Sequence, residues 1–185
     1  MRLFLFFAIL LLTALNCQKK QNFETFLVNR NLPSHDSIQL LSKYPEQKLY
    51  NSEVVENNTR TAFITQVASF LDNHSQRNIS FDDYKCKALY KNDTLEIWLN
   101  NYNGYFGNGV LVQVFNDHFR IRDINPKALK NEVKFIETHA LNQKLILNGS
   151  KFNKNDSIYG FIDYKCSIDP LVDKHFKGYF KTLIQ

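Results

Sequence analysis

Apolar and polar residues alternate along most of the chain from Ile79 onward, in short runs separated by Asn, Asp and Gly. This period-two pattern is typical of half-buried β-strands, because successive side chains of a strand point to opposite faces. It is clearest in the segments 85–100 and 110–122, each interrupted once by an Asn-Asp pair. We therefore expect each of these two segments to form an antiparallel hairpin.

The first hairpin is predicted to turn at Asn92-Asp93, a pair that suits a two-residue turn. Tyr90 then opposes Leu95, and Cys86 opposes Leu99. In this register one face is apolar and the other is largely charged, and a shift of one residue would mix the two. The apolar face carries Tyr84, Cys86, Ala88, Tyr90, Leu95, Ile97 and Leu99, and the other face carries Lys85, Lys87 and Glu96.

The second hairpin is predicted to turn at Asn116-Asp117 and separates the two kinds of residue equally well. Val110, Val112, Val114, Phe119 and Ile121 share one face, opposite Gln113, His118, Arg120 and Arg122. The outer faces of both hairpins also carry apolar residues that need cover. These residues are Leu89, Trp98, Leu111 and Phe115.

Helical spacing appears before the alternating region. In 59–74 the residues Phe63, Ile64, Val67, Phe70 and Leu71 fall on one helical face. The segment is predicted to be a helix that covers the outer apolar residues, although its β-branched residues keep a strand as the alternative. A shorter helix, capped by Ser34 or Asp36 and ended by Pro45, is expected to carry Ile38, Leu40 and Leu41.

The remaining alternating segments predict strands at 133–138, 144–148, 157–168 and 175–184. Together the elements indicate an α+β, mainly β fold: an antiparallel β-sandwich of about seven strands over 79–185. A helical lead-in at 34–75 precedes it, and 34–185 form a single globular domain. A strongly curved single sheet remains the alternative.

The N-terminus is predicted to be a signal peptide covering residues 1–16. Arg2 precedes a run from Leu3 to Leu15 that is apolar apart from Thr13. A helix of this length reaches roughly 20 Å, which is short of a membrane core of about 30 Å.

Cys17 directly follows the apolar run and resembles the lipobox cysteine of bacterial lipoproteins. Ala14 and Asn16 depart from the usual lipobox residues, so an ordinary signal peptide with an incidental Cys17 remains the alternative. The resemblance implies acylation of Cys17, a lipid-anchored tether over 17–33, and the membrane as a partner. We expect the protein in the cell envelope, at the outer membrane, with its side of that membrane left open.

The chain has three cysteines. Acylation of Cys17 would leave Cys86 and Cys166, both facing the predicted core in an oxidising compartment. We therefore expect a Cys86–Cys166 disulfide.

Composition narrows the function classes. Without residues 1–16, and so without Arg2, 22 basic residues face 18 acidic ones, for a net charge of +4. The charges are interspersed, so nucleic acid is not expected as a partner. His35, His74, His118, His139 and His175 show no metal-binding spacing, and no cofactor motif is present. We expect neither a metal nor a cofactor.

One loop has a composition suited to ligand binding. Residues 100–109 contain Tyr102, Tyr105 and Phe106 among Asn and Gly. Such aromatic side chains can stack on sugars or anchor a peptide, or they can fold back onto the core.

The sequence therefore predicts a lipid-anchored envelope protein that acts as a non-catalytic binding or accessory module, with a glycan or a protein as its partner. The alternatives are an envelope hydrolase acting on glycan or peptide, and a structural subunit of an outer-membrane assembly.

Overall fold

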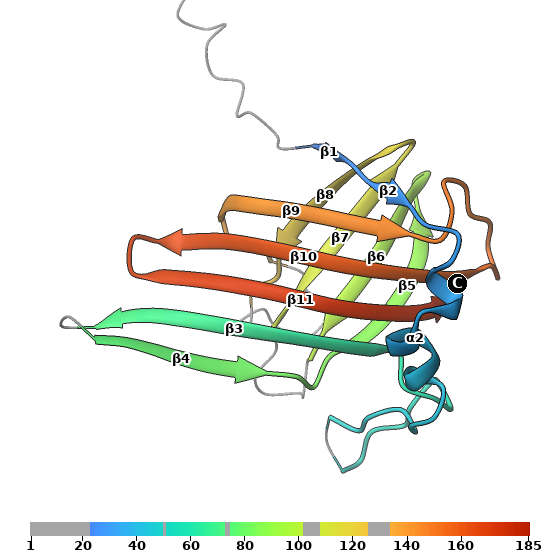
Figure 1. Cartoon of the computed structure of the whole chain (residues 1–185), viewed down its shortest axis with the longest axis horizontal. Coiled ribbons are helices and arrows are strands. Elements are labelled where there is room, and N and C mark those ends of the chain that lie inside the picture. The colour runs from blue at the N-terminus through green and yellow to red at the C-terminus, as the bar shows by residue number, and fades with distance from the viewer. Residues whose placement is uncertain (1–22, 50, 73–74, 102–107, 126–133) are drawn as a thin grey trace, which may run out of the picture.

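The computed structural model describes residues 23–49, 51–72, 75–101, 108–125 and 134–185. Within these ranges the chain forms two β-sheets, accompanied by one short α-helix and one 3-10 turn (Figure 1). The predicted mainly β, sandwich-like fold is confirmed. The described residues contain eleven strands rather than about seven. The short or fully exposed edge strands lack an apolar alternation, and the strand Ala62–Asp72 was predicted as a helix.

The first layer is a five-stranded antiparallel sheet in the order β1-β8-β7-β6-β5. Its strands are β1 (Glu24–Thr25), β5 (Lys85–Lys91), β6 (Thr94–Asn100), β7 (Gly109–Phe115) and β8 (His118–Asp123).

The second layer is a six-stranded sheet in the order β2-β9-β10-β11-β3-β4. Its strands are β2 (Leu27–Val28), β3 (Ala62–Asp72), β4 (Ser75–Phe81), β9 (His139–Leu147), β10 (Ser157–Asp169) and β11 (Val172–Leu183). All its pairings are antiparallel except that of β2 with β9. The strands of the two sheets cross at an angle (Figure 1).

Both edges of the five-stranded sheet are tied to the other layer. On one side the chain passes from β1 to β2 through Phe26, whose side chain is buried in the core. On the other side Ala88 of β5 bridges to Ile184, and the Gln185 amide donates to the Ala88 carbonyl at 2.9 Å. The segment from Glu24 to Val28, expected within the tether, thus pairs with both sheets.

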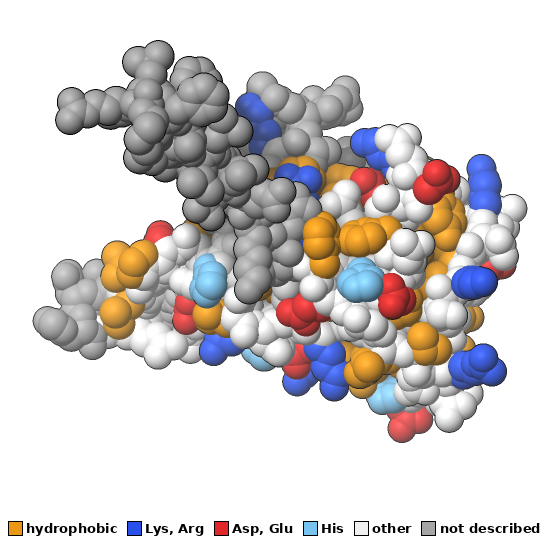
Figure 2. Space-filling view, turned by 90° about the horizontal axis from the view of Figure 1, so that it is seen from above, with side chains coloured by type: hydrophobic (Ala, Val, Ile, Leu, Met, Phe, Trp, Pro, Cys, Tyr) orange, Lys and Arg blue, Asp and Glu red, His pale blue; other side chains and the backbone are white. Residues whose placement is uncertain are grey.

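The inward-facing residues of the two sheets form one hydrophobic core. Its largest fully buried aromatic side chains are Tyr84, Phe119, Tyr164, Phe176 and Phe180. On the face that Figure 2 shows, charged side chains of both signs are interspersed, as their spacing in the sequence predicted.

Both predicted hairpins are confirmed in turn and in register. Tyr90 pairs with Leu95 and Cys86 with Leu99, while Phe115 pairs with His118 across the second turn. Asn92 and Asp93 have positive φ angles of 48° and 60°, as a type I′ turn requires.

The prediction of a helix over 59–74 is wrong. These residues contain β3, in which Ala62, Ile64, Gln66 and Ala68 are buried alternately. Pairing with β11 along one edge and β4 along the other satisfies the backbone of β3. The residues therefore adopt the extended alternative that their β-branched side chains favour.

The shorter predicted helix is present as α2 (Asp36–Leu41), which follows the 3-10 turn η1 (Leu32–Ser34). Its N-cap is His35 rather than Ser34 or Asp36, and the His35 Nδ1 accepts a hydrogen bond from the Ser37 amide at 3.2 Å. Ile38 and Leu41 are buried where α2 packs on β3 and β11.

Three further differences concern the strands. β4 was not predicted as a separate strand, because all seven of its residues are exposed and carry no apolar pattern. The strand expected at 133–138 is reduced, within its described residues, to a bridge between Ile124 and Phe135. β9 and β11 begin earlier than the strands predicted at 144–148 and 175–184, and each ends one residue before the predicted end.

Candidate binding site

The outer face of the five-stranded sheet presents residues turned away from the core. One cross-strand row on this face runs from Lys87 of β5 through Trp98 and Leu111 to Arg122 of β8. Leu111 is only 2% exposed, whereas Trp98 and Arg122 are partly exposed. The row therefore has an apolar centre and a cation at each end.

The neighbouring row supplies polar groups. It runs from Leu89 through Glu96 and Gln113 to Arg120. Glu96 is only 7% exposed, and its carboxylate accepts hydrogen bonds from the Trp98 indole at 3.2 Å and from the Gln113 amide at 3.5 Å. Glu96 therefore holds the indole and the amide in fixed positions.

The segment beyond β8 places a second aromatic ring beside this face. A bridge joins Phe135 to Ile124, and the Arg122 guanidinium carbon lies 3.4 Å from the centroid of the Phe135 ring. The predicted helical cover is absent, because the described residues of 59–74 contain β3 of the other sheet. Leu111 instead shares a concavity with Arg122 and Phe135, and Phe23 contacts Phe115 edge-on, with 5.1 Å between ring centroids.

These side chains line a concavity of about 400 Å³, which we call the Trp98 concavity. Its lining combines two aromatic rings with a carboxylate, amides, a hydroxyl and cations. The lining residues are Lys91, Asn92, Thr94, Glu96, Trp98, Leu111, Gln113, Arg122 and Phe135.

Burial affects the electrostatics of Arg122. The pKa of the Arg122 guanidinium is lowered mainly by burial and to a lesser extent by repulsion from Arg120. The nearby Glu96 carboxylate acts in the opposite direction and raises it. A guanidinium has so high an intrinsic pKa that Arg122 remains charged at neutral pH.

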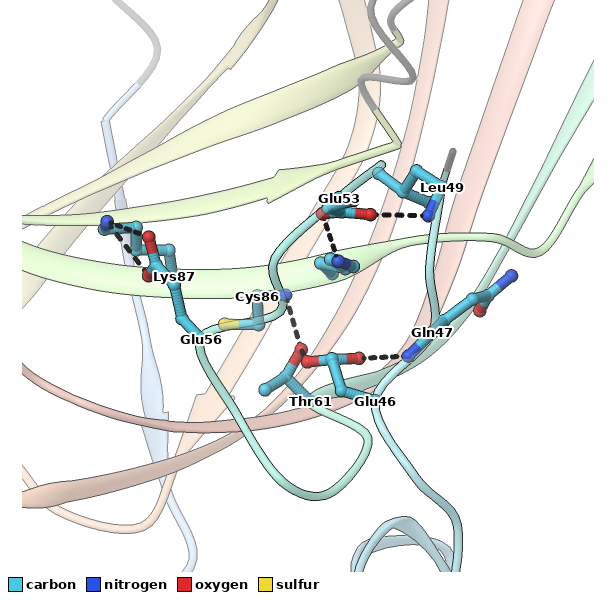
Figure 3. A network of polar contacts seen from close by, with 9 residues as sticks. Glu46, Gln47, Leu49, Glu53, Glu56, Thr61, Cys86 and Lys87 are labelled. Atoms are coloured by element: carbon cyan, nitrogen blue, oxygen red, sulfur yellow. Dashed lines mark hydrogen bonds and ion pairs between the residues drawn. The ribbon is translucent and has the colours of Figure 1, made fainter. Parts of the chain in front are cut away.

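An irregular segment, described at 46–49 and 51–58, lies against the edge strand β5 (Figure 3). Glu53 forms an ion pair with Lys85, and Glu56 forms one with Lys87 at 3.1 Å. The segment places an acidic partner beside two of the lysines on the outer face of β5.

The first residue of this segment makes a buried polar contact next to Cys86 (Figure 3). Glu46 accepts a hydrogen bond from the Thr61 hydroxyl at 2.6 Å, and the Thr61 oxygen accepts one from the Cys86 amide at 3.0 Å. Burial and the nearby Glu46 raise the pKa of the Cys86 thiol well above its ordinary value. The thiol is therefore protonated and unreactive at neutral pH.

A second polar cluster lies inside the sandwich around Asp123, which is 2% exposed. Its carboxylate accepts hydrogen bonds from the hydroxyls of Tyr164 at 2.7 Å and Thr138 at 3.2 Å, from the Cys166 thiol at 3.6 Å, and from Lys174 at 3.4 Å. Burial, followed by repulsion from Asp123, raises the pKa of Cys166 to about 12. This thiol is also no nucleophile at neutral pH.

The predicted Cys86–Cys166 disulfide is wrong. Both thiols are free and buried. Cys86 lies on the edge strand of the five-stranded sheet, whereas Cys166 lies on the interior strand β10 of the other sheet. The period-two pattern correctly predicted that both side chains face the core, but it carries no information about which strands face each other across that core.

Other predicted site residues lie outside the described residues. These are Cys17 and the loop aromatics Tyr102, Tyr105 and Phe106. The described ends of that loop are joined, because the Asn101 amide donates to the Asn108 carbonyl at 2.9 Å and the Asn108 amide to the Asn101 side chain at 2.7 Å.

Neither a metal centre nor a membrane-spanning helix is found in the described part of the chain. No group of three or more His, Cys, Asp or Glu residues there is arranged to hold a metal ion. No helix among the described residues is both long enough and apolar enough to cross a membrane.

Comparisons with protein-family models, with curated protein sequences and with solved structures found no match to this chain. The candidate site is therefore defined by its geometry. The sequence placed Trp98, Leu111 and Arg122 on the outer faces of two hairpins, but a helix was expected to cover the apolar Trp98 and Leu111. The signal for a site was the presence of an indole and a guanidinium beside apolar residues on the outer faces of the two hairpins.

Proposed function

We propose that this protein is a non-catalytic binding module of the cell envelope that holds a glycan in the Trp98 concavity. The observation that carries the proposal is the row Trp98–Leu111–Arg122, bordered by the buried Glu96. The hydrogen bond from the indole to Glu96 fixes the ring, so little side-chain entropy remains to be lost on binding.

The chemistry of the lining suits a sugar. A pyranose ring has an apolar C–H face and a rim of hydroxyl groups, so it needs an aromatic surface and nearby hydrogen-bonding groups. Trp98 and Phe135 supply rings, and Gln113 and Thr94 supply polar groups at the same concavity. Its volume of about 400 Å³ is within the range of pockets for small ligands.

The same lining favours binding over hydrolysis. A glycosidase places two carboxyl groups on either side of the scissile bond. Among the described lining residues, Glu96 is the only carboxylate. One of its oxygens accepts a hydrogen bond from Trp98, and the other accepts one from Gln113. The concavity therefore lacks, within the described lining, the pair that this chemistry uses.

We also propose that the module is anchored through an acylated Cys17, on the basis of its position directly after the apolar run from Leu3 to Leu15. Stable anchoring requires more than one acyl chain. The Cys17→Ala variant should leave the membrane fraction and lose incorporation of a labelled fatty acid. Fractionation of this variant with the membrane, as for the wild type, would contradict the anchor.

Glycan binding can be followed directly, because Trp98 is the only tryptophan of the chain. A panel of neutral and acidic oligosaccharides should contain ligands that change its fluorescence and that bind by calorimetry. Trp98→Ala should lower the affinity at least tenfold while the protein stays folded by circular dichroism.

Tyr179→Ala is the matched control. Tyr179 is also a partly exposed aromatic residue, but it lies on β11 of the other sheet, where it stacks on His35. This variant should bind as the wild type does. If the wild-type protein binds no member of the panel, or if Trp98→Ala retains full affinity, the proposed function is wrong.

A further inference from the structure

The basic side chains on the outer face of the five-stranded sheet fall into two groups. Lys85 and Lys87 have acidic partners from the loop, Glu53 and Glu56. Lys91, Arg120 and Arg122 have no acidic side chain within ion-pair distance among the described residues. Among the described residues, the cation at one end of the row that contains Trp98 is therefore ion-paired, and the cation at the other end is not.

Arg122 is positioned to use its charge. Its guanidinium packs over the Phe135 ring, with 3.4 Å between the central carbon and the ring centroid. Stacking on an aromatic ring leaves the N–H groups at the edge of the guanidinium plane available, and these match a carboxylate or phosphate in two-point contacts. Arg120, two residues before Arg122 on the same face of β8, adds positive charge near it.

The only acid in the described lining, Glu96, balances part of the charge of Arg122, but both its oxygens are held in hydrogen bonds. Glu96 is almost fully buried below the concavity, and its oxygens accept hydrogen bonds from Trp98 and Gln113. The cations Lys91 and Arg122 lie in the same lining. An anionic group on the ligand would thus meet cations, with the carboxylate of Glu96 already engaged.

We propose that the ligand of the Trp98 concavity is an acidic saccharide, whose sugar ring packs against Trp98 while its carboxylate or phosphate group binds Arg122. This inference rests on the proposed function and adds the charge class of the ligand.

The test compares saccharides that differ only in charge. Trigalacturonic acid is titrated against its neutral methyl ester, and mannose 6-phosphate against mannose, by calorimetry and by Trp98 fluorescence. The wild type should bind at least one acidic member at least tenfold more tightly than its neutral partner. The preference should fall as salt is raised, because exposed charges are screened. The pair that shows the preference identifies the anionic group as carboxylate or phosphate.

Two variants separate charge recognition from sugar recognition. Arg122→Gln should reduce the affinity for the acidic saccharide to that for its neutral partner, while Trp98→Ala should weaken both. Lys87→Gln is the matched control, because Lys87 lies in the same cross-strand row and is paired with Glu56. This variant should keep the preference.

Equal affinity of the wild type for acidic and neutral partners, or a preference that survives Arg122→Gln, overturns the inference and leaves the proposed function standing. Binding of inorganic phosphate or acetate as tightly as the matching acidic sugar also overturns it, because the sugar ring would then contribute nothing. If no saccharide of either charge binds, the proposed function fails and the inference fails with it.

Discussion

Asp123 of β8 and Lys174 of β11 form an ion pair across the interior of the sandwich, with 3.4 Å between the carboxylate Oδ1 and the ammonium Nζ. The pair links the two sheets, and both side chains are at least nine-tenths buried. Removing one partner of a buried pair leaves an uncompensated charge, which costs more than the intact pair contributes to stability.

Lys174→Met should therefore lower the free energy of unfolding by about 3–5 kcal/mol, measured by urea denaturation. Lys87→Met breaks the exposed pair with Glu56 and should cost less than about 1 kcal/mol. The double variant Asp123→Asn/Lys174→Met should recover part of the loss in a double-mutant cycle. Equal effects of Lys174→Met and Lys87→Met would show that the interior pair is not desolvated as the structure has it.

The two buried cysteines should remain thiols even in an oxidising solution. A disulfide closing a loop of about 80 residues would contribute roughly 4 kcal/mol on the chain-entropy model. Since Cys86 and Cys166 lie on strands of different sheets and are both free, we expect the unfolding temperature to be the same with and without reductant. A non-reduced digest that links the two peptides would contradict this expectation.

Gly178 should not tolerate a side chain. Its φ angle is 156°, and a Cβ atom there would lie 2.0 Å from the carbonyl oxygen of Phe63 on the paired strand β3. We expect Gly178→Ala to lower the free energy of unfolding by more than about 2 kcal/mol, through backbone strain and displacement of β3. Thermal and urea unfolding provide the measurement.

Gly149→Ala is the matched control for this substitution. A Cβ atom at Gly149 would meet its nearest neighbour at 3.7 Å, an ordinary contact. Its effect should stay within about 0.5 kcal/mol. Similar losses for the two variants would indicate that the close approach of Gly178 to β3 does not determine stability.

Asp163 should make stability depend on acidity. Burial alone would raise the pKa of its carboxyl, but hydrogen bonds from His175 and Lys177 outweigh burial and lower it. A carboxyl whose pKa is lower in the folded state than in the unfolded state stabilises the fold above the unfolded pKa of about 4. That contribution is lost as the pH falls from about 4 through the lower pKa of the folded state.

The urea midpoint of Asp163→Asn should accordingly differ most from that of the wild type above pH 5, and the two should converge as the pH approaches 3. The corresponding difference in the free energy of unfolding should be below about 1 kcal/mol, because His175 and Lys177 are exposed partners. A difference that widens on acidification would contradict the lowered pKa.

The two hairpins were predictable because all the information they need is local. Asn92-Asp93 and Asn116-Asp117 adopt the positive φ angles of tight turns at Asn92, Asp93 and Asn116. Once such a turn is placed, alternation fixes the register and the buried face of each strand. The short helix ending at Leu41 was predictable for the same reason, although its cap was not.

The identity of β3 was decided by partners far away in the chain. Phe63 pairs with Tyr179, and Phe70 pairs with Val172. The apolar residues of β3 fit one face of a helix as well as one face of a strand. Hydrogen bonding to the edge of β11 selects the strand conformation. A sequence window contains neither β11 nor its hydrogen-bonding groups, so it favoured the helix.

For the cysteines and the candidate site too, the sequence predicted which way each side chain faces, and the tertiary structure decided which residues it contacts. The alternation predicted that Cys86 and Cys166 face the core and that Trp98, Gln113 and Arg122 face outward. The structure confirms all five directions. The order of strands in each sheet then separated the two thiols and placed Trp98 beside Leu111 and Arg122. The facing direction of a side chain follows from its own strand, whereas its neighbours depend on how distant strands pair, because those contacts form only when the sheets assemble.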